Sequence, residues 1–274
     1  MLRQTNKQTG FPSIDKPWLK YYTNEQVEKP LPKCSIFDYI YEKNKDYPDD
    51  KAFEYFGRNI SYRELFDNIE KAAKAFKGLG IKEGSIVPII SVTIPETIYT
   101  FYGLNRIGAI SNMIDPRTSI SGIREYIQEV DAQVVIVIDA AYKRIVEAIE
   151  NTNVKTIISL SPADSLRFPK RQLYLLAKGV KLRDRDLGWA DFLSKGVNES
   201  LDRDRYKEGN CTTIVHTGGT TGMPKGVMLS DDNLNAAADQ ALNSPIPLER
   251  NDIFPKSVKL LYSFFKEMLM KQGI

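Results

Sequence analysis

The sequence has few of the residues from which metal centres, disulfides and acid–base sites are usually built. Its 274 residues include one histidine, His216, and two cysteines, Cys34 and Cys211. Two isolated cysteines match neither the spacing of zinc ligands nor a disulfide framework. We therefore interpret them as inert thiols of a reducing compartment.

Three further signals are missing. The chain has no run of about 18 uncharged apolar residues, the length that a membrane-spanning helix needs. Residues 1–7 are polar and lead into no apolar core of a secretory signal. The net charge of +3 is too small to indicate nucleic-acid binding. We expect a cytoplasmic protein with no nucleic-acid partner.

What the chain does contain is an alternation of strands and helices. From residue 86 onward, apolar patterns predict strands at 86–92, 109–114, 134–138 and 156–160, separated by helices at 95–107, 121–130 and 141–151. A helix at 61–79 precedes them, with Ser61 and Glu64 as a capping box and Gly80 after its end. Alternation of this kind predicts an α/β fold with a mainly parallel sheet and crossover helices.

Three segments depart from this pattern. Residues 1–33 contain prolines and aromatics that predict an extended N-terminal arm laid on the domain, not a helix. Residues 164–189 carry seven basic side chains against three acidic ones. This predicts a solvated helical face, with contact to an anionic membrane surface as the alternative. Residues 251–274 form a tail rich in lysine and aromatics that diverges from the domain predicted at 34–250.

A glycine-rich loop is the strongest functional signal. Residues 217–226 contain four glycines, three threonines and one lysine. Glycines allow a tight turn whose N–H groups form a nest for anions, while hydroxyls and a lysine add donors and positive charge. The pattern predicts a polyphosphate site formed by Thr217, Gly218, Gly219, Thr220, Thr221, Gly222 and Lys225. An ordinary glycine-rich hairpin is the alternative, and a Walker loop fits poorly because proline precedes the lysine and glycine follows it.

The order of these residues resembles the phosphate-binding signature of adenylate-forming enzymes, such as acyl-CoA synthetases, luciferase and the adenylation domains of peptide synthetases. Every position from Thr217 to Gly226 fits that signature. Residues 60–65 and 104–109 resemble two weaker elements of the same family, and residues 10–18 look most like bacterial long-chain acyl-CoA synthetases. The resemblance implies that residues 34–250 form the N-terminal part of the family's AMP-binding large domain.

This resemblance implies an activity. The enzymes of the family activate a carboxylic acid, here most consistent with a fatty acid, with ATP as an acyl-adenylate, and acyl-CoA synthetases then pass the acyl group to CoA. The threonines would donate hydroxyls to the phosphates, the glycines would present N–H groups and Lys225 would act as an electrostatic clamp. ATP, CoA and Mg²⁺ are therefore the implied small molecules. No metal ligand is assigned, because the family's magnesium, ribose and C-terminal lysine elements are not found in the sequence.

The missing elements leave other interpretations open. We expect this chain to be inactive alone, since the C-terminal small domain is absent. A non-catalytic fragment that binds a nucleotide or a partner, and a fragment of an amino-acid adenylation domain, are the alternatives. An incomplete sheet would expose an edge, which predicts self-association. His216 is expected to pack rather than to act as an acid or base. Residues 230–233 are expected to start a helix, with Asp231 where many relatives carry histidine.

Overall fold

A seven-stranded sheet forms the centre of the computed structural model, which describes residues 9–202, 205–216 and 225–242. The strand order is β7-β6-β5-β3-β4-β8-β9. The strands are β3 (Ile86–Ile90), β4 (Ile110–Ile114), β5 (Val134–Ile138), β6 (Thr156–Leu160), β7 (Leu187–Gly188), β8 (Cys211–His216) and β9 (Gly226–Ser230). All neighbouring pairs are parallel except β8 and β9. The predicted α/β fold with a mainly parallel sheet is confirmed.

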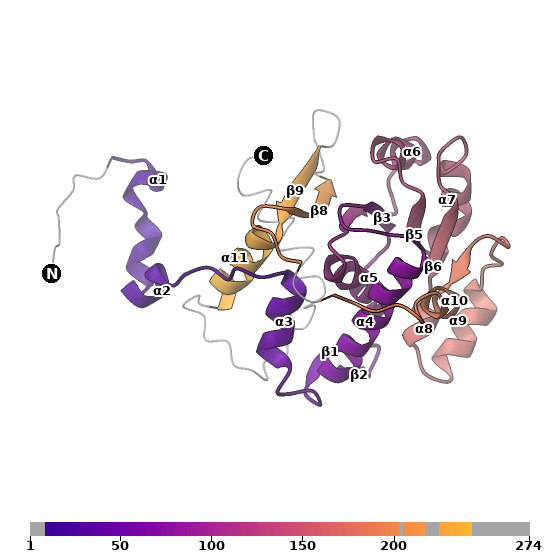
Figure 1. Cartoon of the computed structure of the whole chain (residues 1–274), viewed down its shortest axis with the longest axis horizontal. Helices are drawn as coiled ribbons and strands as arrows, with labels where there is room; N and C mark the ends of the chain where they lie inside the picture. Colours follow the sequence, from indigo (N-terminus) through magenta and orange to yellow (C-terminus); the bar gives the residue numbers. More distant parts are fainter. Residues whose placement is uncertain (1–8, 203–204, 217–224, 243–274) are drawn as a thin grey trace.

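Helices cover both faces of this sheet (Figure 1). On one face α4 (Tyr62–Gly78) packs on α5 (Pro95–Arg106) and on α10 (Trp189–Ser194). On the other face α6 (Ile120–Glu129) packs on α7 (Tyr142–Ala148), which follows a short 3₁₀ turn, η2 (Asp139–Ala141). Right-handed crossovers explain this division. Along the strand order, the chain steps one way from β3 to β4 and the opposite way from β4 to β5, so a right-handed connection places the two sets of helices on opposite faces.

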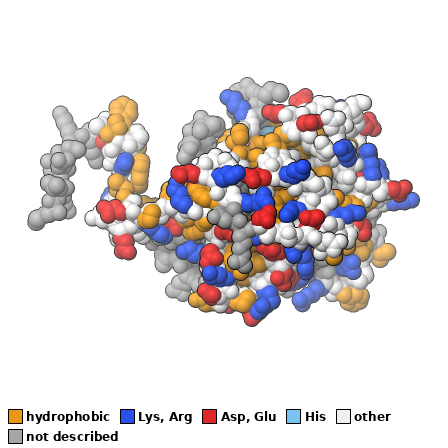
Figure 2. Space-filling view, viewed as in Figure 1, with side chains coloured by type: hydrophobic (Ala, Val, Ile, Leu, Met, Phe, Trp, Pro, Cys, Tyr) orange, Lys and Arg blue, Asp and Glu red, His pale blue; other side chains and the backbone are white. Residues whose placement is uncertain are grey.

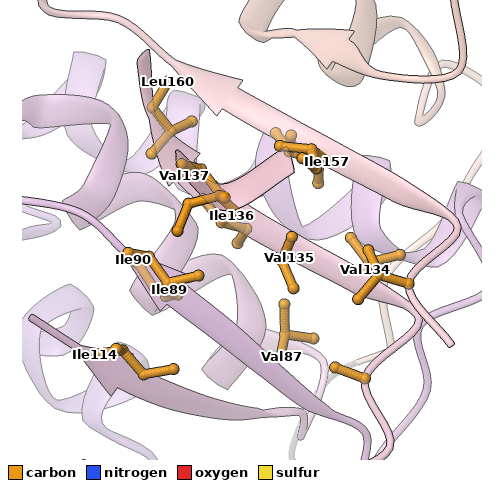
Figure 3. Close-up of a cluster of buried hydrophobic side chains, with 14 of the residues drawn as sticks. Val87, Ile89, Ile90, Ile114, Val134, Val135, Ile136, Val137, Ile157 and Leu160 are labelled. Carbon is orange, nitrogen blue, oxygen red and sulfur yellow. The ribbon is translucent and has the colours of Figure 1, made fainter. Parts of the chain in front are cut away.

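The core lies between the helices and the inner strands. All five residues of β5 are buried, as its unbroken apolar run predicts, and they contact the apolar side chains of β3 and β6 (Figure 3). Phe76 of α4 and Phe192 of α10 are fully buried and lie 4.8 Å apart between ring centroids. The core thus joins helices α4 and α10 to the inner strands of the sheet.

A second group of elements lies beside the sheet. A hairpin of β1 (Lys51–Tyr55) and β2 (Arg58–Ser61) precedes α4, and α3 (Ile36–Asn44) packs on α11 (Asp231–Leu242). Ile36, Leu229 and Leu234 form a small cluster there. Residues far apart in the sequence, at 36 and 234, thus close the end of the sheet next to β9.

The N-terminal segment forms short helical turns where a fully extended arm was expected. They are α1 (Pro12–Asp15), the 3₁₀ turn η1 (Pro17–Tyr21) and α2 (Asn24–Glu28). Proline stands at the start of α1 and of η1, where its missing N–H costs nothing, and Thr23 forms a capping box for α2. The segment projects from the body in Figure 1 rather than lying on it, and Lys29 pairs with Asp239 at 2.9 Å.

Residues 162–189 also hold more structure than the sequence indicated. They form α8 (Pro162–Ser165), α9 (Lys170–Lys178) and the two-residue strand β7. A helix is present here as predicted, and α9 has no buried residue, which fits both the predicted solvated face and the membrane-surface alternative. No helix in the described ranges is long and apolar enough to cross a membrane. The predicted tail at 251–274 lies outside the described residues.

Candidate functional site

The predicted phosphate loop connects two paired strands. β8 runs parallel to β4, with Val215 opposite Met113, and antiparallel to β9, with His216 opposite Gly226. The chain therefore leaves the sheet after His216 at the carboxyl ends of the parallel strands, and it returns there. Ligands of open α/β sheets bind at this edge.

Only part of the predicted phosphate site can be placed. Thr217, Gly218, Gly219, Thr220, Thr221 and Gly222 lie outside the described residues, and their role stays a prediction. Lys225 is described and is exposed directly before β9. Since Gly226 pairs with His216, Lys225 lies at the carboxyl edge of the sheet, where its ammonium group can attract an anion.

His216 is held at the start of this connection by two contacts. Its Nε2 lies 2.7 Å from Oδ1 of Asn112 on β4, and its ring stacks on Tyr126 of α6, with 3.9 Å between ring centroids. Burial lowers the pKa of His216, with a smaller opposing effect from Glu129. The imidazole is therefore neutral at pH 7, and with Asn112 Oδ1 as acceptor the proton lies on Nε2. The expected packing role of His216 is confirmed.

The turn after β4 is held by a second set of contacts. The guanidinium of Arg117 donates to the Asp115 carboxylate, with Nη2 2.6 Å from Oδ2. Arg144 of α7 donates to the carbonyls of Pro116 and Thr118 at 2.8 and 2.7 Å. Because Asp115 neutralises Arg117, this turn adds little net charge to the edge and serves mainly to hold its shape.

A buried carboxylate lies where β3 leads into α5. Glu96, the second residue of α5, is 1% exposed; its Oε1 accepts from Ser165 Oγ at 2.5 Å, and Oε2 has no partner among the described residues. Burial raises the pKa of Glu96 to about 7. Next to it in the sheet order, Asp139 follows β5 and accepts from the Tyr174 hydroxyl at 2.8 Å. Both acids were missed from the sequence; the available signals were the position of Asp139 directly after a predicted strand and that of Glu96 in the first turn of the next predicted helix.

These acids do not form a metal centre. The described part of the chain has no group of three or more histidine, cysteine, aspartate or glutamate residues that could hold a metal ion. For Mg²⁺, the described residues therefore show no fitting ligand set.

Asp231 lies at the far end of β9 and points inward. It accepts from the Ile36 backbone N–H at 3.0 Å and from Asn105 Nδ2 at 2.8 Å, and burial raises its pKa. Ser230 and Asn233 cap α11 reciprocally, so the predicted helix start is confirmed. Asp231 thus joins α11 to α3 and α5, and it lies away from the carboxyl edge of the sheet.

A cavity in the described part of the chain lies remote from the loop. It has a volume of about 620 Å³ and opens at the amino ends of β4 and β8, lined partly by Glu83, Arg205, Lys207 and Cys211. Both cations pair with Glu83, so the cavity has little net positive charge for a polyphosphate. Burial raises the pKa of the Cys211 thiol, which makes a nucleophilic thiolate less available. This cavity therefore adds nothing to the predicted phosphate site.

Comparisons with known proteins show which proteins this chain resembles. A family model described as AMP-binding enzyme matches residues 40–262. A long-chain-fatty-acid–CoA ligase of Bacillus subtilis is 26% identical over 229 residues, which cover 81% of this chain and 41% of that protein. An acetyl-coenzyme A synthetase of Streptomyces coelicolor is 29% identical, covering 62% of this chain and 26% of that protein. The chain thus spans less than half the length of these relatives.

Solved structures show the same fold. An anthranilate CoA ligase in complex with anthranoyl-AMP superimposes with a TM-score of 0.64 at 18% identity, covering 79% of this chain and 38% of that one. A long-chain-fatty-acid-CoA ligase from Archaeoglobus fulgidus gives 0.62 at 22% identity, covering 78% and 40%. The match of the family model extends over the strands that flank the glycine-rich loop, and over most of the chain. The chain therefore belongs to the AMP-binding enzyme family.

Proposed function

We propose that this chain supplies the ATP-phosphate-binding part of a ligase that converts a carboxylic acid to an acyl-adenylate and then to a CoA thioester. The observation that carries the proposal is the position of the β8–β9 connection. β8 ends and β9 begins at the carboxyl edge of the sheet, Lys225 lies directly before β9, and the family match extends across both strands. A fatty acid is the proposed substrate, supported by the long-chain ligase of Bacillus subtilis, which covers more of this chain than the acetyl-CoA synthetase does.

The chemistry requires a site of this kind because the reactants are anions. A carboxylate must approach the α-phosphate of ATP while pyrophosphate leaves with the developing charge. Lys225 would attract the phosphates, and the hydroxyls and N–H groups of residues 217–222 would donate to them. His216 would orient the start of the loop through its contacts with Asn112 and Tyr126. Mg²⁺, when bound with ATP, would neutralise part of the phosphate charge.

Calorimetric titration of the chain with MgATP tests the nucleotide part of the proposal. Replacing the loop lysine, Lys225→Ala, is expected to weaken binding at least about tenfold, because one charge-assisted contact is lost. Lys71→Ala is the matched control, since it removes an exposed lysine from α4 and leaves the loop unchanged. Binding that is equal in all three proteins, or no binding to a folded chain, would overturn the proposal.

Exchange of labelled pyrophosphate into ATP tests the reaction itself. We expect exchange by the ligase to depend on an added carboxylic acid and to be faster with long-chain fatty acids than with acetate. Loss of the Lys225 ammonium is expected to cost about 2–4 kcal/mol of transition-state stabilisation, by analogy with single oxyanion donors. Exchange that prefers acetate, or an amino acid, would reject the fatty-acid assignment and keep the adenylate-forming one.

A further inference from the structure

Helix α9 turns its apolar side chains away from the protein. Leu176 is 87% exposed and Leu173 is 62% exposed, and Phe168 just before the helix is 80% exposed. A surface helix of a globular domain normally presents its apolar stripe to the core. Leu173 and Leu176 are three residues apart and therefore share one side of the helix, but that side is not covered by the described part of the chain.

Polar contacts hold α9 in this orientation. The hydroxyl of Tyr174, the one half-buried side chain of α9, donates to Asp139 at 2.8 Å. At the start of the helix, Lys170 Nζ donates to the carbonyl of Phe56 at 3.0 Å, next to the Phe56 ring, which is 66% exposed. The exposed leucines are thus displayed by a helix attached to the core rather than by a free end.

Basic side chains surround these apolar ones. The helix and its flanks carry exposed cations at Arg167, Lys170, Arg171, Lys178 and Lys181, and α9 itself contains no acidic residue. Figure 2 shows blue and orange side chains next to one another at the end of the molecule where α9 lies. Long basic side chains can extend their charges to lipid headgroups while apolar neighbours enter the acyl boundary.

We propose that this surface, formed by Phe168, Leu173, Leu175 and Leu176 with the five cations named above, binds peripherally to an anionic lipid bilayer. Charge complementarity selects this partner, because the surface combines large apolar side chains with cations and lacks acids on α9. Negative headgroups attract such clusters, and each lysine or arginine near the surface strengthens the attraction. The proposal is independent of the proposed reaction, since it uses none of residues 216–225.

Flotation of the chain with vesicles tests the proposal. We expect binding to mixed phosphatidylcholine–phosphatidylglycerol vesicles and much weaker binding to pure phosphatidylcholine. Raising the salt from about 0.1 M to about 1 M is expected to release the protein, because screening shortens the reach of the cations. The double variant Leu173→Gln/Leu176→Gln is expected to lower the partition coefficient at least about tenfold. Arg171→Gln/Lys178→Gln is expected to remove most of the preference for the anionic vesicles.

The N-terminal arm provides a matched control. Phe11→Gln/Ile14→Gln removes two apolar side chains, each 65% exposed, and is expected to change vesicle binding less than about twofold. Circular dichroism establishes that each variant is folded, which we expect because the replaced side chains are exposed. Vesicle binding that survives both α9 variants, or is lost only in the arm variant, would overturn the proposal. A leucine variant that turns a dimer into a monomer in sedimentation, with vesicle binding unchanged, would assign the surface to a second copy and equally reject it.

Discussion

Replacing Glu96 by glutamine is expected to stabilise the fold above neutral pH. Glu96 is almost fully buried, and burial raises the pKa of its carboxyl group from the ordinary 4.5 to about 7. A tenfold change in an equilibrium corresponds to about 1.4 kcal/mol. The ionised fold is therefore about 3 kcal/mol less stable, relative to the unfolded chain, than the protonated fold. Glutamine is always neutral and can keep the acceptor for Ser165 Oγ.

The sign of the effect follows from proton binding. The folded state holds the Glu96 proton more tightly than the unfolded chain does. The contribution of the protonated group is therefore complete below about pH 4.5 and is lost as the pH rises to about 7. Below about pH 4.5, Glu96→Gln and the parent chain should have nearly equal free energies of unfolding. At about pH 8 the variant should be more stable by up to about 3 kcal/mol.

Urea unfolding followed by circular dichroism, at several values from about pH 5 to about pH 8, measures this difference. When the free energy of unfolding of the parent chain is subtracted from that of the variant, the contributions of titrating groups that both proteins share, such as Asp231, cancel. Glu125→Gln, at an exposed position of α6, is the control for the chemical change alone. If the free energies of unfolding of the Glu96 variant and the parent chain change in parallel with pH over this range, the reasoning about burial is refuted.

Three further changes test the packing and the site. Asp231→Ala is expected to lower the free energy of unfolding by about 2–3 kcal/mol, because two buried donors lose their acceptor; urea unfolding checks this, and an unchanged midpoint would contradict it. Gly196→Ala is expected to cost about 1–3 kcal/mol, because the new methyl group would meet the backbone of α4; the same assay would show an error if the variant were as stable as the parent. Asn112→Ala removes the partner of His216 Nε2 and is expected to weaken MgATP binding about tenfold, with a loss of stability of about 1–3 kcal/mol because the ring N–H loses its acceptor; equal affinities of the folded variant and the parent in calorimetry would show that His216 does not orient the loop.

Much of the sheet could be predicted from the sequence because its signals are local. The strands at 134–138 and 156–160 have the predicted bounds, since an unbroken apolar run marks a strand that is covered on both faces. The start of α4 is capped as predicted, with the Ser61 side chain accepting from the Glu64 N–H. Glu64 does not complete the predicted capping box, because its carboxylate pairs with Arg58. Gly80 follows the helix with φ +79°, a conformation that favours glycine.

The features that were missed depend on contacts across the fold. Helix α9 was predicted only as a solvated helical face somewhere within residues 164–189; its bounds were missed because its leucines face outward, so its apolar pattern does not mark a buried side. Asn112 and Tyr126 were not associated with the phosphate loop because β4 and α6 meet His216 only in the folded sheet. Lys225 was singled out as a residue of a conspicuous motif; its phosphate-binding role stays a prediction, and its position at the carboxyl edge follows from strand pairing.

The polar attachment of α9 explains how a helix can keep leucines exposed. Apolar burial has no preferred direction, so a helix held only by apolar contacts would be expected to turn its leucines inward. Hydrogen bonds are directional, and the bond from Tyr174 to Asp139 fixes one side of α9 toward the sheet. The bond from Ser165 to the buried Glu96 fixes the preceding α8 in the same way. Two buried acids that take no part in the phosphate site therefore orient the surface that we propose for the bilayer.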